Sequence, residues 1–229
     1  MIQAHPEHNI LQAFTLGQLD DLQMAMVAVH LSYCSACKKQ HVQMESIEAD
    51  KCFADATDIA QQPEFDVKAM LDTITSSDNI VAAEINTSIK MEFQNKEFEI
   101  PKVLAGIVAR AGHWQSVIGN LWQKSVTNHG LGYQIDFIYM EAGGSTPKHT
   151  HRGTEYTLVL DGCFSDASGD YHPGDLIVRN NQDEHTPWSD TGCLCLAAID
   201  APLHFTSGLA RLINPFSNLF FKSEANKVF

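Results

Sequence analysis

Apolar residues recur at helical spacing in the first third of the chain. Three short stripes have most of their members three or four positions apart, which places each stripe on one face of a helix. Their members are Ile10, Leu11, Phe14 and Leu19, then Leu22, Met26, Val29 and Tyr33, and finally Val67, Met70, Leu71 and Ile74. Residues 39–60 are polar but favour a helix. The pattern predicts a small region built of helices alone.

The period changes beyond residue 101. Short apolar runs now alternate with turns rich in Gly, Pro and Asp, a pattern typical of an antiparallel sandwich or barrel. The runs span residues 133–140, 154–160, 175–178 and 193–199. The fold class is therefore expected to be α + β, with an all-α domain followed by an antiparallel β-barrel or sandwich.

Between the two patterns the chain is polar and has no clear period. This stretch predicts a linker over residues 86–100, after a helical domain over 1–85. The β-domain is expected over 101–216, followed by a C-terminal tail over 217–229.

Charge and composition narrow the function classes. The 229 residues include 15 Lys and Arg against 28 Asp and Glu, which gives a net charge of −13. No basic cluster exceeds Lys38-Lys39, which argues against a nucleic-acid binder. The sequence holds no apolar run of membrane-span length, and its start lacks the basic and apolar regions of a secretory signal. We expect a cytoplasmic protein without direct contact to nucleic acid or membrane.

Cysteine and histidine are unusually frequent, with 6 Cys and 11 His. In a reducing compartment, metal ligation or burial is a better explanation for the cysteines than disulfides. His30, Cys34 and Cys37 are spaced so that they share one face of a helix. Zinc takes four N or S ligands, so a fourth ligand is needed, and His5 and His8 are both candidates. A redox Cys-x-x-Cys pair is the alternative interpretation.

A second group of candidate ligands lies in the predicted strands. His149 and His151 are two apart and project from one face of a strand, and Glu155 follows at the same parity if that strand continues. A later strand offers His185. Three imidazoles and a carboxylate suit zinc, iron, manganese, nickel or copper. A barrel with a lost site is the alternative.

These motifs carry a family resemblance. The early His and the His-x3-Cys-x2-Cys motif resemble the zinc-binding domain of anti-sigma factors. In that family the early His precedes an apolar pair in the first helix, and His5 before Ile10 and Leu11 fits better than His8. The resemblance therefore implies a zinc site made of His5, His30, Cys34 and Cys37.

The second group has the spacing of the first cupin motif. Together with the flanking segments HRGTEYTLVLDGCFSD, YHPGDL and CLCLAAIDAPLHF, it resembles the ChrR-type anti-sigma factors, which carry a cupin-like domain. The resemblance implies one divalent metal at His149, His151, Glu155 and His185, with zinc favoured over iron, manganese or nickel. It further implies a non-enzymatic protein that sequesters an extracytoplasmic-function sigma factor. Release is implied under oxidative stress, singlet oxygen in particular.

Two other function classes compete with this interpretation. Many cupins are metal-dependent dioxygenases or isomerases, although the same fold also hosts non-catalytic members. A DNA-binding regulator would need a basic recognition helix, which the acidic first half does not offer. Cys193 and Cys195 are interpreted as core thiols, with a redox sensor as the alternative.

Overall fold

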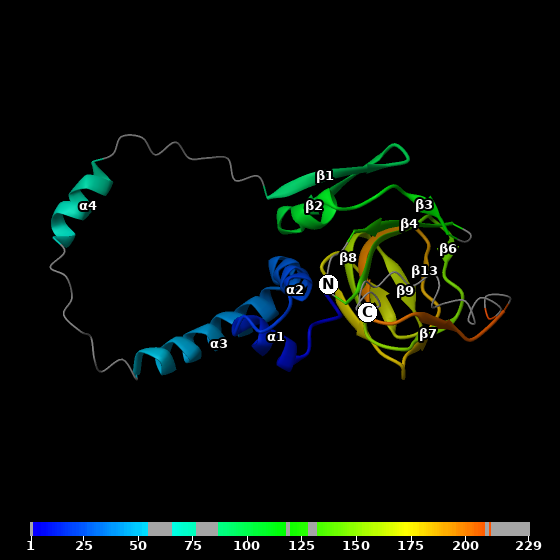
Figure 1. Cartoon of the computed structure of the whole chain (residues 1–229), viewed down its shortest axis with the longest axis horizontal. Helices are drawn as coiled ribbons and strands as arrows, with labels where there is room; N and C mark the ends of the chain where they lie inside the picture. Colours follow the sequence, from blue (N-terminus) through cyan, green and yellow to red (C-terminus); the bar gives the residue numbers. More distant parts are fainter. Residues whose placement is uncertain are drawn as a thin grey trace, which may run out of the picture.

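The computed structural model describes residues 2–54, 66–76, 87–117, 120–127, 132–208 and 211. The predicted tail over 217–229 lies outside these residues. Helices come first and antiparallel strands follow, as Figure 1 shows, so the expected α + β class is confirmed.

The described residues before position 77 form helices, both at the predicted apolar stripes and in the polar stretch that favoured a helix. These helices are α1 (His8–Thr15), α2 (Asp21–Tyr33), α3 (Ser35–Ala54) and α4 (Val67–Thr75). The Asp20 side chain caps α2 by accepting a hydrogen bond from the backbone N–H of Gln23. None of the helices in the described ranges is long and apolar enough to cross a membrane.

The chain breaks direction at Cys34, where the sequence predicted one continuous helical face. Cys34 adopts an extended conformation (φ −105°, ψ 100°), ends α2 and is followed directly by α3. The expectation that His30, Cys34 and Cys37 share one helix is therefore wrong. His30 belongs to α2 and Cys37 to the first turn of α3, so the ligands converge at a helix–helix corner.

A β-hairpin occupies the segment predicted to be a linker. Strands β1 (Ser88–Phe93) and β2 (Lys96–Pro101) pair across a two-residue turn, in which Gln94 and Asn95 have φ values of 48° and 62°. Two positive φ values at these positions are typical of a type I′ hairpin turn. Phe93 packs against Trp114, Trp122 and Tyr139, so the hairpin lies on the β-domain. The domain boundaries themselves remain a prediction.

A short 3-10 turn η1 (Lys102–Leu104) and helix α5 (Ala105–Ala109) lead into the β-domain. Its largest sheet in the described residues has the strand order β11-β8-β14-β5-β4-β3, and two smaller antiparallel sheets have the orders β10-β9-β13-β6 and β12-β7-β15. The strands are β3 (Gln115–Ser116), β4 (Leu121–Val126), β5 (Gln134–Met140), β6 (Gly144–Ser145), β7 (His149–His151), β8 (Glu155–Gly162), β9 (Phe164–Asp166), β10 (Gly169–Tyr171), β11 (Leu176–Arg179), β12 (Glu184–His185), β13 (Trp188–Ser189), β14 (Cys193–Ile199) and β15 (Leu203–Phe205).

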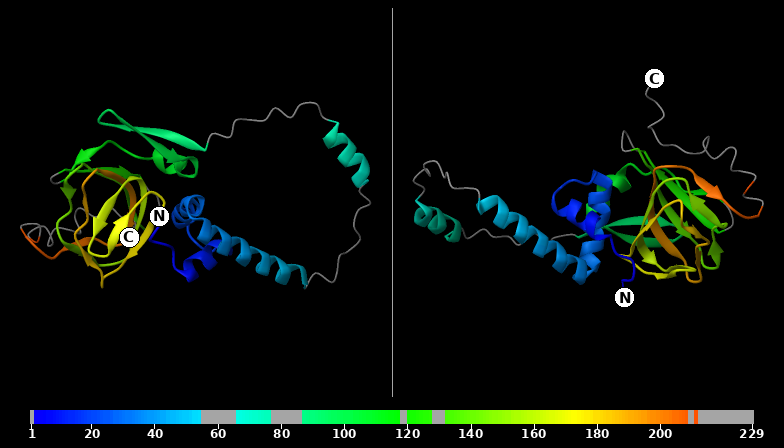
Figure 2. Two further views of the ribbon diagram at one scale, coloured as in Figure 1. Left: turned by 180° about the vertical axis from the view of Figure 1, so that it is seen from behind. Right: turned by 90° about the horizontal axis from the view of Figure 1, so that it is seen from below.

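The helices and the β-domain share one apolar core. Leu22 and Met26 of α2 belong to the same buried cluster as Phe137, Leu158 and Leu176 of the large sheet. In Figures 1 and 2, α2 lies beside the β-domain, and it contacts β11. The inner faces of the sheets enclose the second cluster of candidate ligands.

Candidate metal centres

The first cluster forms where the N-terminal segment meets the α2–α3 corner. His5, His30, Cys34 and Cys37 bring one donor atom each to within 4.8 Å of the others. The Nδ1 atom of His5 lies 3.5 Å from Sγ of Cys34 and 3.4 Å from Sγ of Cys37. Tetrahedral zinc, with bonds of about 2.3 Å to S and 2.0–2.1 Å to N, separates such donors by about 3.5 Å. The structure places His5 in this group, and His8 begins α1.

His30 is oriented as a ligand by a contact from the β-domain. Its Nδ1 atom lies 2.7 Å from the carbonyl oxygen of Gly174. A carbonyl only accepts, so Nδ1 carries the proton and Nε2 keeps its lone pair. That Nε2 atom is buried and has no hydrogen-bond partner in the part of the chain that the structure describes. Burial also lowers the pKa of His30, which keeps the ring neutral.

The two thiols of this cluster are held close together. Sγ of Cys34 accepts a bond of 3.4 Å from the backbone N–H of Cys37. Burial and the neighbouring Cys34 raise the pKa of Cys37 to about 11, so a metal must displace its proton. An orphaned imidazole nitrogen beside two thiols fits a thiophilic ion with tetrahedral geometry.

The second cluster lies inside the β-domain. His149 and His151 project from β7, Glu155 begins β8, and His185 lies on β12 directly opposite His149. The Nε2 atom of His185 lies 3.1 Å from that of His149 and 3.2 Å from that of His151. His151 Nε2 also lies 3.1 Å from a carboxylate oxygen of Glu155. Metal bonds of about 2.1 Å separate adjacent donors by about 3.0–3.4 Å, so this spacing fits one small ion.

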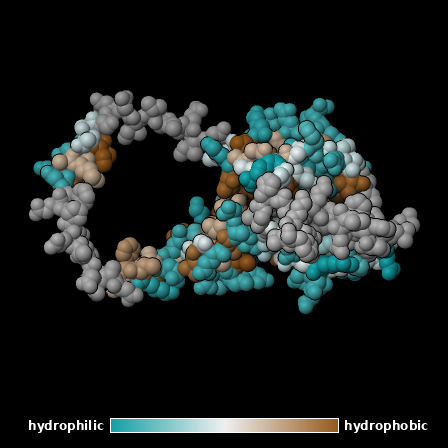
Figure 3. Space-filling view, in the orientation of Figure 1, coloured by the Kyte–Doolittle hydropathy of each residue, from teal (hydrophilic) through white to brown (hydrophobic). Residues whose placement is uncertain are grey.

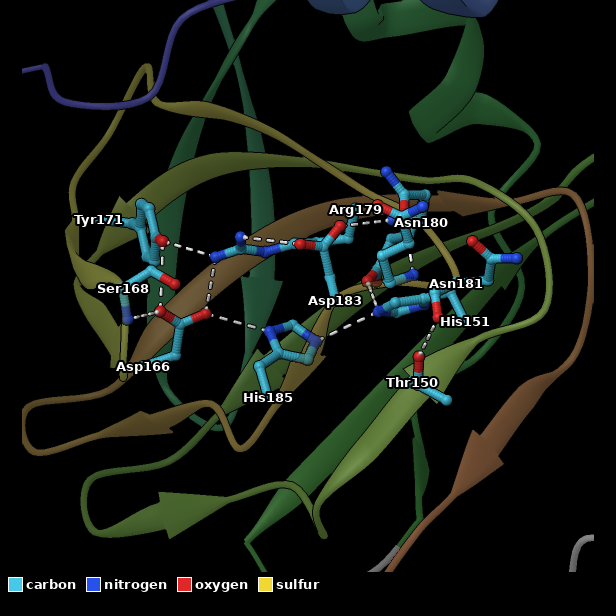
Figure 4. Close-up of polar contacts among 12 residues, drawn as sticks. Thr150, His151, Asp166, Ser168, Tyr171, Arg179, Asn180, Asn181, Asp183 and His185 are labelled. Atoms are coloured by element: carbon cyan, nitrogen blue, oxygen red, sulfur yellow. Dashed lines mark hydrogen bonds and ion pairs between the residues drawn. The ribbon is translucent and has the colours of Figure 1, made fainter.

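Two residues outside the predicted ligand set orient His185, as Figure 4 shows. His185 Nδ1 lies 3.1 Å from Asp166 Oδ2, and Arg179 donates to the same oxygen at 2.9 Å. Burial opposes ionisation of Asp166, but bonds from Ser168 and His185 and the Arg179 charge lower its pKa. A carboxylate behind an imidazole is a common support of metal ligands. No local signal in the sequence marks this pair, because Asp166 lies on β9 and Arg179 on β11, away from the strands that carry the motif.

The second cluster sits at the edge of a cavity of about 220 Å³. Most of its lining is apolar, with Ile138, Met140 and Phe164 among the side chains, and Cys193 and Cys195 line it as well. Both thiols are buried, and the hydrogen bond that Cys195 shares with Cys193, together with burial, raises the pKa of Cys195. Cys195 is therefore a neutral thiol at the cavity wall.

Burial sets the protonation of the second cluster before a metal arrives. It lowers the pKa of His149 to about 4 and that of His151 to about 3, so both rings are neutral near pH 7. It raises the pKa of Glu155 to about 7. Neutral imidazoles and one titrating carboxylate fit a divalent cation, whose charge would ionise Glu155 outright.

This protonation pattern predicts proton release on metal binding. Below pH 7 the metal must displace a proton from Glu155, so we expect its dissociation constant to rise about tenfold per pH unit. Well above pH 7 this carboxylate adds no pH dependence. Calorimetry in two buffers of different ionisation enthalpy counts the protons released.

Glu155→Gln is the matched control, because it keeps the size of the side chain and removes the titration. At pH 6 the unmodified chain should release about one proton more than this variant, and at pH 8 the difference should vanish. Equal proton release at pH 6 would contradict a raised pKa at Glu155.

The chain is similar to known proteins in both sequence and fold. Residues 105–201 match the family described as the ChrR cupin-like domain. The anti-sigma-E factor ChrR of Cereibacter sphaeroides is 30% identical over an alignment of 222 residues, and the match covers 94% of this chain and 98% of that protein. The solved structure of Rhodobacter sphaeroides SigE in complex with the anti-sigma ChrR aligns with a TM-score of 0.61 and 23% identity. That alignment covers 87% of this chain and 100% of the other.

The structure and the family match together define an α + β protein in which a helical region with a His/Cys cluster precedes a cupin-like domain with a His/Glu cluster. Sequence identity over nearly the full length of both chains is stronger evidence of common family membership than a shared fold alone. The chain belongs to the ChrR family of anti-sigma factors.

Proposed function

We propose that the chain binds an extracytoplasmic-function sigma factor through its helical region and withholds it from RNA polymerase in the cytoplasm. Family membership carries this proposal, because the relative named above is an anti-sigma factor that was matched over nearly its whole length. An anti-sigma factor acts by binding, so we assign no catalytic residue to the chain.

Helix α4 offers an apolar surface suited to such a partner. Its apolar residues recur at the spacing i, i+3, i+4, i+7 and are 53–60% exposed. These residues are Val67, Met70, Leu71 and Ile74. Figure 1 shows α4 apart from the other described elements, and Figure 3 shows the apolar surface that it presents. An amphipathic helix with its apolar face uncovered is a common protein-binding element.

Charge favours the same partner. Residues 1–90 contain 13 acidic and 5 basic residues. A sigma factor must contact DNA and therefore carries basic surfaces, so the acidic region attracts it at long range. This attraction speeds association, and the apolar residues of α4 supply affinity.

We further propose that zinc occupies the first cluster and that a divalent metal, with zinc favoured, occupies the second. Zinc at His5, His30, Cys34 and Cys37 would join the N-terminal segment to the α2–α3 corner. The ion in the cupin-like domain would belong to the part that releases the sigma factor under oxidative stress. Imidazole and thiol groups are oxidisable, which supports a role for either cluster in that response.

The test of the docking surface uses two charged substitutions on α4. We expect Met70→Asp combined with Leu71→Asp to weaken binding of an extracytoplasmic-function sigma factor from the same genome at least about 100-fold. Each substitution places a carboxylate in an apolar contact. Calorimetry of purified full-length chains measures the affinity.

Ala69→Asp is the matched control, because Ala69 is exposed on the opposite face of α4. An acidic residue in the first turn also favours the helix. This variant should bind as the unmodified chain does. If the charged pair binds equally well, α4 is not the docking surface. If the unmodified chain binds none of these sigma factors, the proposed function is wrong.

A further inference from the structure

The turn over residues 172–175, just before β11, fastens the N-terminal segment to the cupin-like domain. Asp175 is fully buried, and its Oδ1 atom accepts hydrogen bonds from the backbone N–H groups of Gln3 at 2.6 Å and Ala4 at 2.7 Å. Its Oδ2 atom accepts from the N–H of His172 at 2.7 Å. The N–H of Leu176 donates to the carbonyl of Ala4 at 3.2 Å. The residues immediately before His5 are thus held by the β-domain.

The same turn supports a second ligand of the N-terminal cluster. The carbonyl of Gly174 accepts from His30 Nδ1, as described above. Gly174 has a φ of 92°, and a Cβ atom there would collide with Tyr33 at the end of α2 and lie 3.0 Å from Cδ1 of Ile2. Only glycine permits this conformation and this close approach. Two of the four candidate ligands, on separate segments, therefore depend on one turn of the other domain.

Strand β11 runs from this turn to the second cluster. Its first residue follows Asp175 directly, and its last residue is Arg179. Arg179 donates to Asp166, which contacts His185 (Figure 4). Arg179 is also the register partner of Glu155. Four residues of strand span about 13 Å. The two ends of β11 thus adjoin the groups that orient the ligands of the two clusters.

We propose that β11 couples the two metal sites, with Asp175 as the positioning residue at the N-terminal site and Arg179 at the cupin site. A metal bound to His185 fixes Asp166 and Arg179, which fixes the strand and the turn that hold the His5 segment and His30. Loss of the cupin metal loosens this support and weakens metal binding at the N-terminal site. Thermodynamic reciprocity requires the same effect in the opposite direction.

This coupling deepens the proposed function, because it gives a route from the cupin-like domain to the sigma-binding helices. It is nevertheless measurable without a sigma factor, on the full-length chain alone. Failure of the coupling would leave sigma binding untouched, and failure of sigma binding would leave the coupling measurable.

Cobalt(II) reports the N-terminal site selectively. A thiolate-to-cobalt charge-transfer band requires cysteine ligands, which the His/Glu cluster does not contain. Titrating the full-length chain with cobalt gives the dissociation constant of the N-terminal site. We expect Asp175→Ala to raise it by about 10–100-fold, the usual effect of losing a supporting group behind a metal ligand. Asp200→Ala is the control, because Asp200 also caps a backbone N–H in the β-domain, that of Thr154.

A second pair of variants tests the contact from the helical side. Gln3→Pro removes one of the two N-terminal N–H groups that Asp175 binds, whereas Gln3→Ala keeps it. Gln3→Pro should weaken cobalt binding while Gln3→Ala should not. This pair keeps the test valid if Asp175→Ala unfolds the β-domain. Unchanged cobalt affinity in Gln3→Pro, or in a folded Asp175→Ala, would overturn the positioning role.

The coupling itself is tested by emptying the cupin site. His149→Ala removes a ligand on β7, away from β11, and should raise the cobalt dissociation constant of the N-terminal site about fivefold or more. Adding Asp175→Ala should abolish this difference, because the support is already lost. Additive effects of the two substitutions, or no effect of His149→Ala, would refute coupling through β11.

Discussion

Replacing both Cys34 and Cys37 by serine is expected to remove one zinc ion per chain and to abolish sigma binding. Burial explains why the metal matters so much here. Leu11 is the only buried residue of α1, and Cys37 is the only one of the 20-residue α3. Helices with so little buried apolar surface are not held by packing. Structural zinc contributes about 10–16 kcal/mol in zinc-finger peptides, far more than such contacts can replace.

We therefore expect α1 and α3 to lose helical content in this double variant, while α2 stays packed against the β-domain. Far-UV circular dichroism, elemental zinc analysis and calorimetry with the sigma factor measure the three consequences. The loss of affinity should be at least about 100-fold. Cys52→Ser is the matched control, because Cys52 lies exposed on the same α3 helix and outside both clusters. A double variant that kept both its zinc and its partner would disprove the structural role of this cluster.

Local spacing explains what the sequence could predict. His149, His151 and Glu155 lie within seven residues. The alternation of β7 places the two imidazoles on one face, and the short turn over residues 152–154 brings Glu155, the first residue of β8, back beside them. His30, Cys34 and Cys37 lie within eight residues, and even the unforeseen break at Cys34 leaves them convergent. When the ligands are close in the sequence, the predicted ligand set can be right even if the predicted secondary structure is wrong.

Contacts between distant segments explain what the sequence could not predict. The hairpin over 88–101 contains charged residues on its exposed face, so its strands read as a polar stretch. Asp175 lies 171 and 172 residues from the backbone groups that it binds, and a buried carboxylate has no distinctive pattern. The same holds for Asp166, which is 19 residues from His185. The ligands belong to motifs, whereas the groups that orient them are defined only by the fold.

Replacing His149 and His151 by alanine should have the opposite profile to the cysteine variant. The chain should lose its second metal ion, because two of the four donors are gone. Sigma affinity should stay within about threefold of the unmodified value, since α4 and the thiol cluster are intact. Coupling through β11 would weaken zinc binding at the N-terminal site severalfold. That site nevertheless stays filled when the zinc concentration exceeds the dissociation constant by orders of magnitude.

We expect the His149/His151 double variant to bind the sigma factor but not to release it. Transcription from a sigma-dependent promoter should stay repressed when singlet oxygen is generated in cells carrying the variant, whereas the unmodified chain should permit induction. His204→Ala is a suitable control, because His204 lies on β15 outside both clusters.

Induction of transcription by singlet oxygen in cells carrying the variant would place the sensor elsewhere in the chain. Loss of sigma binding in this variant, together with its survival in the cysteine variant, would reverse the roles assigned to the two domains. The cysteine double variant thus tests binding of the sigma factor, and the histidine double variant tests its release.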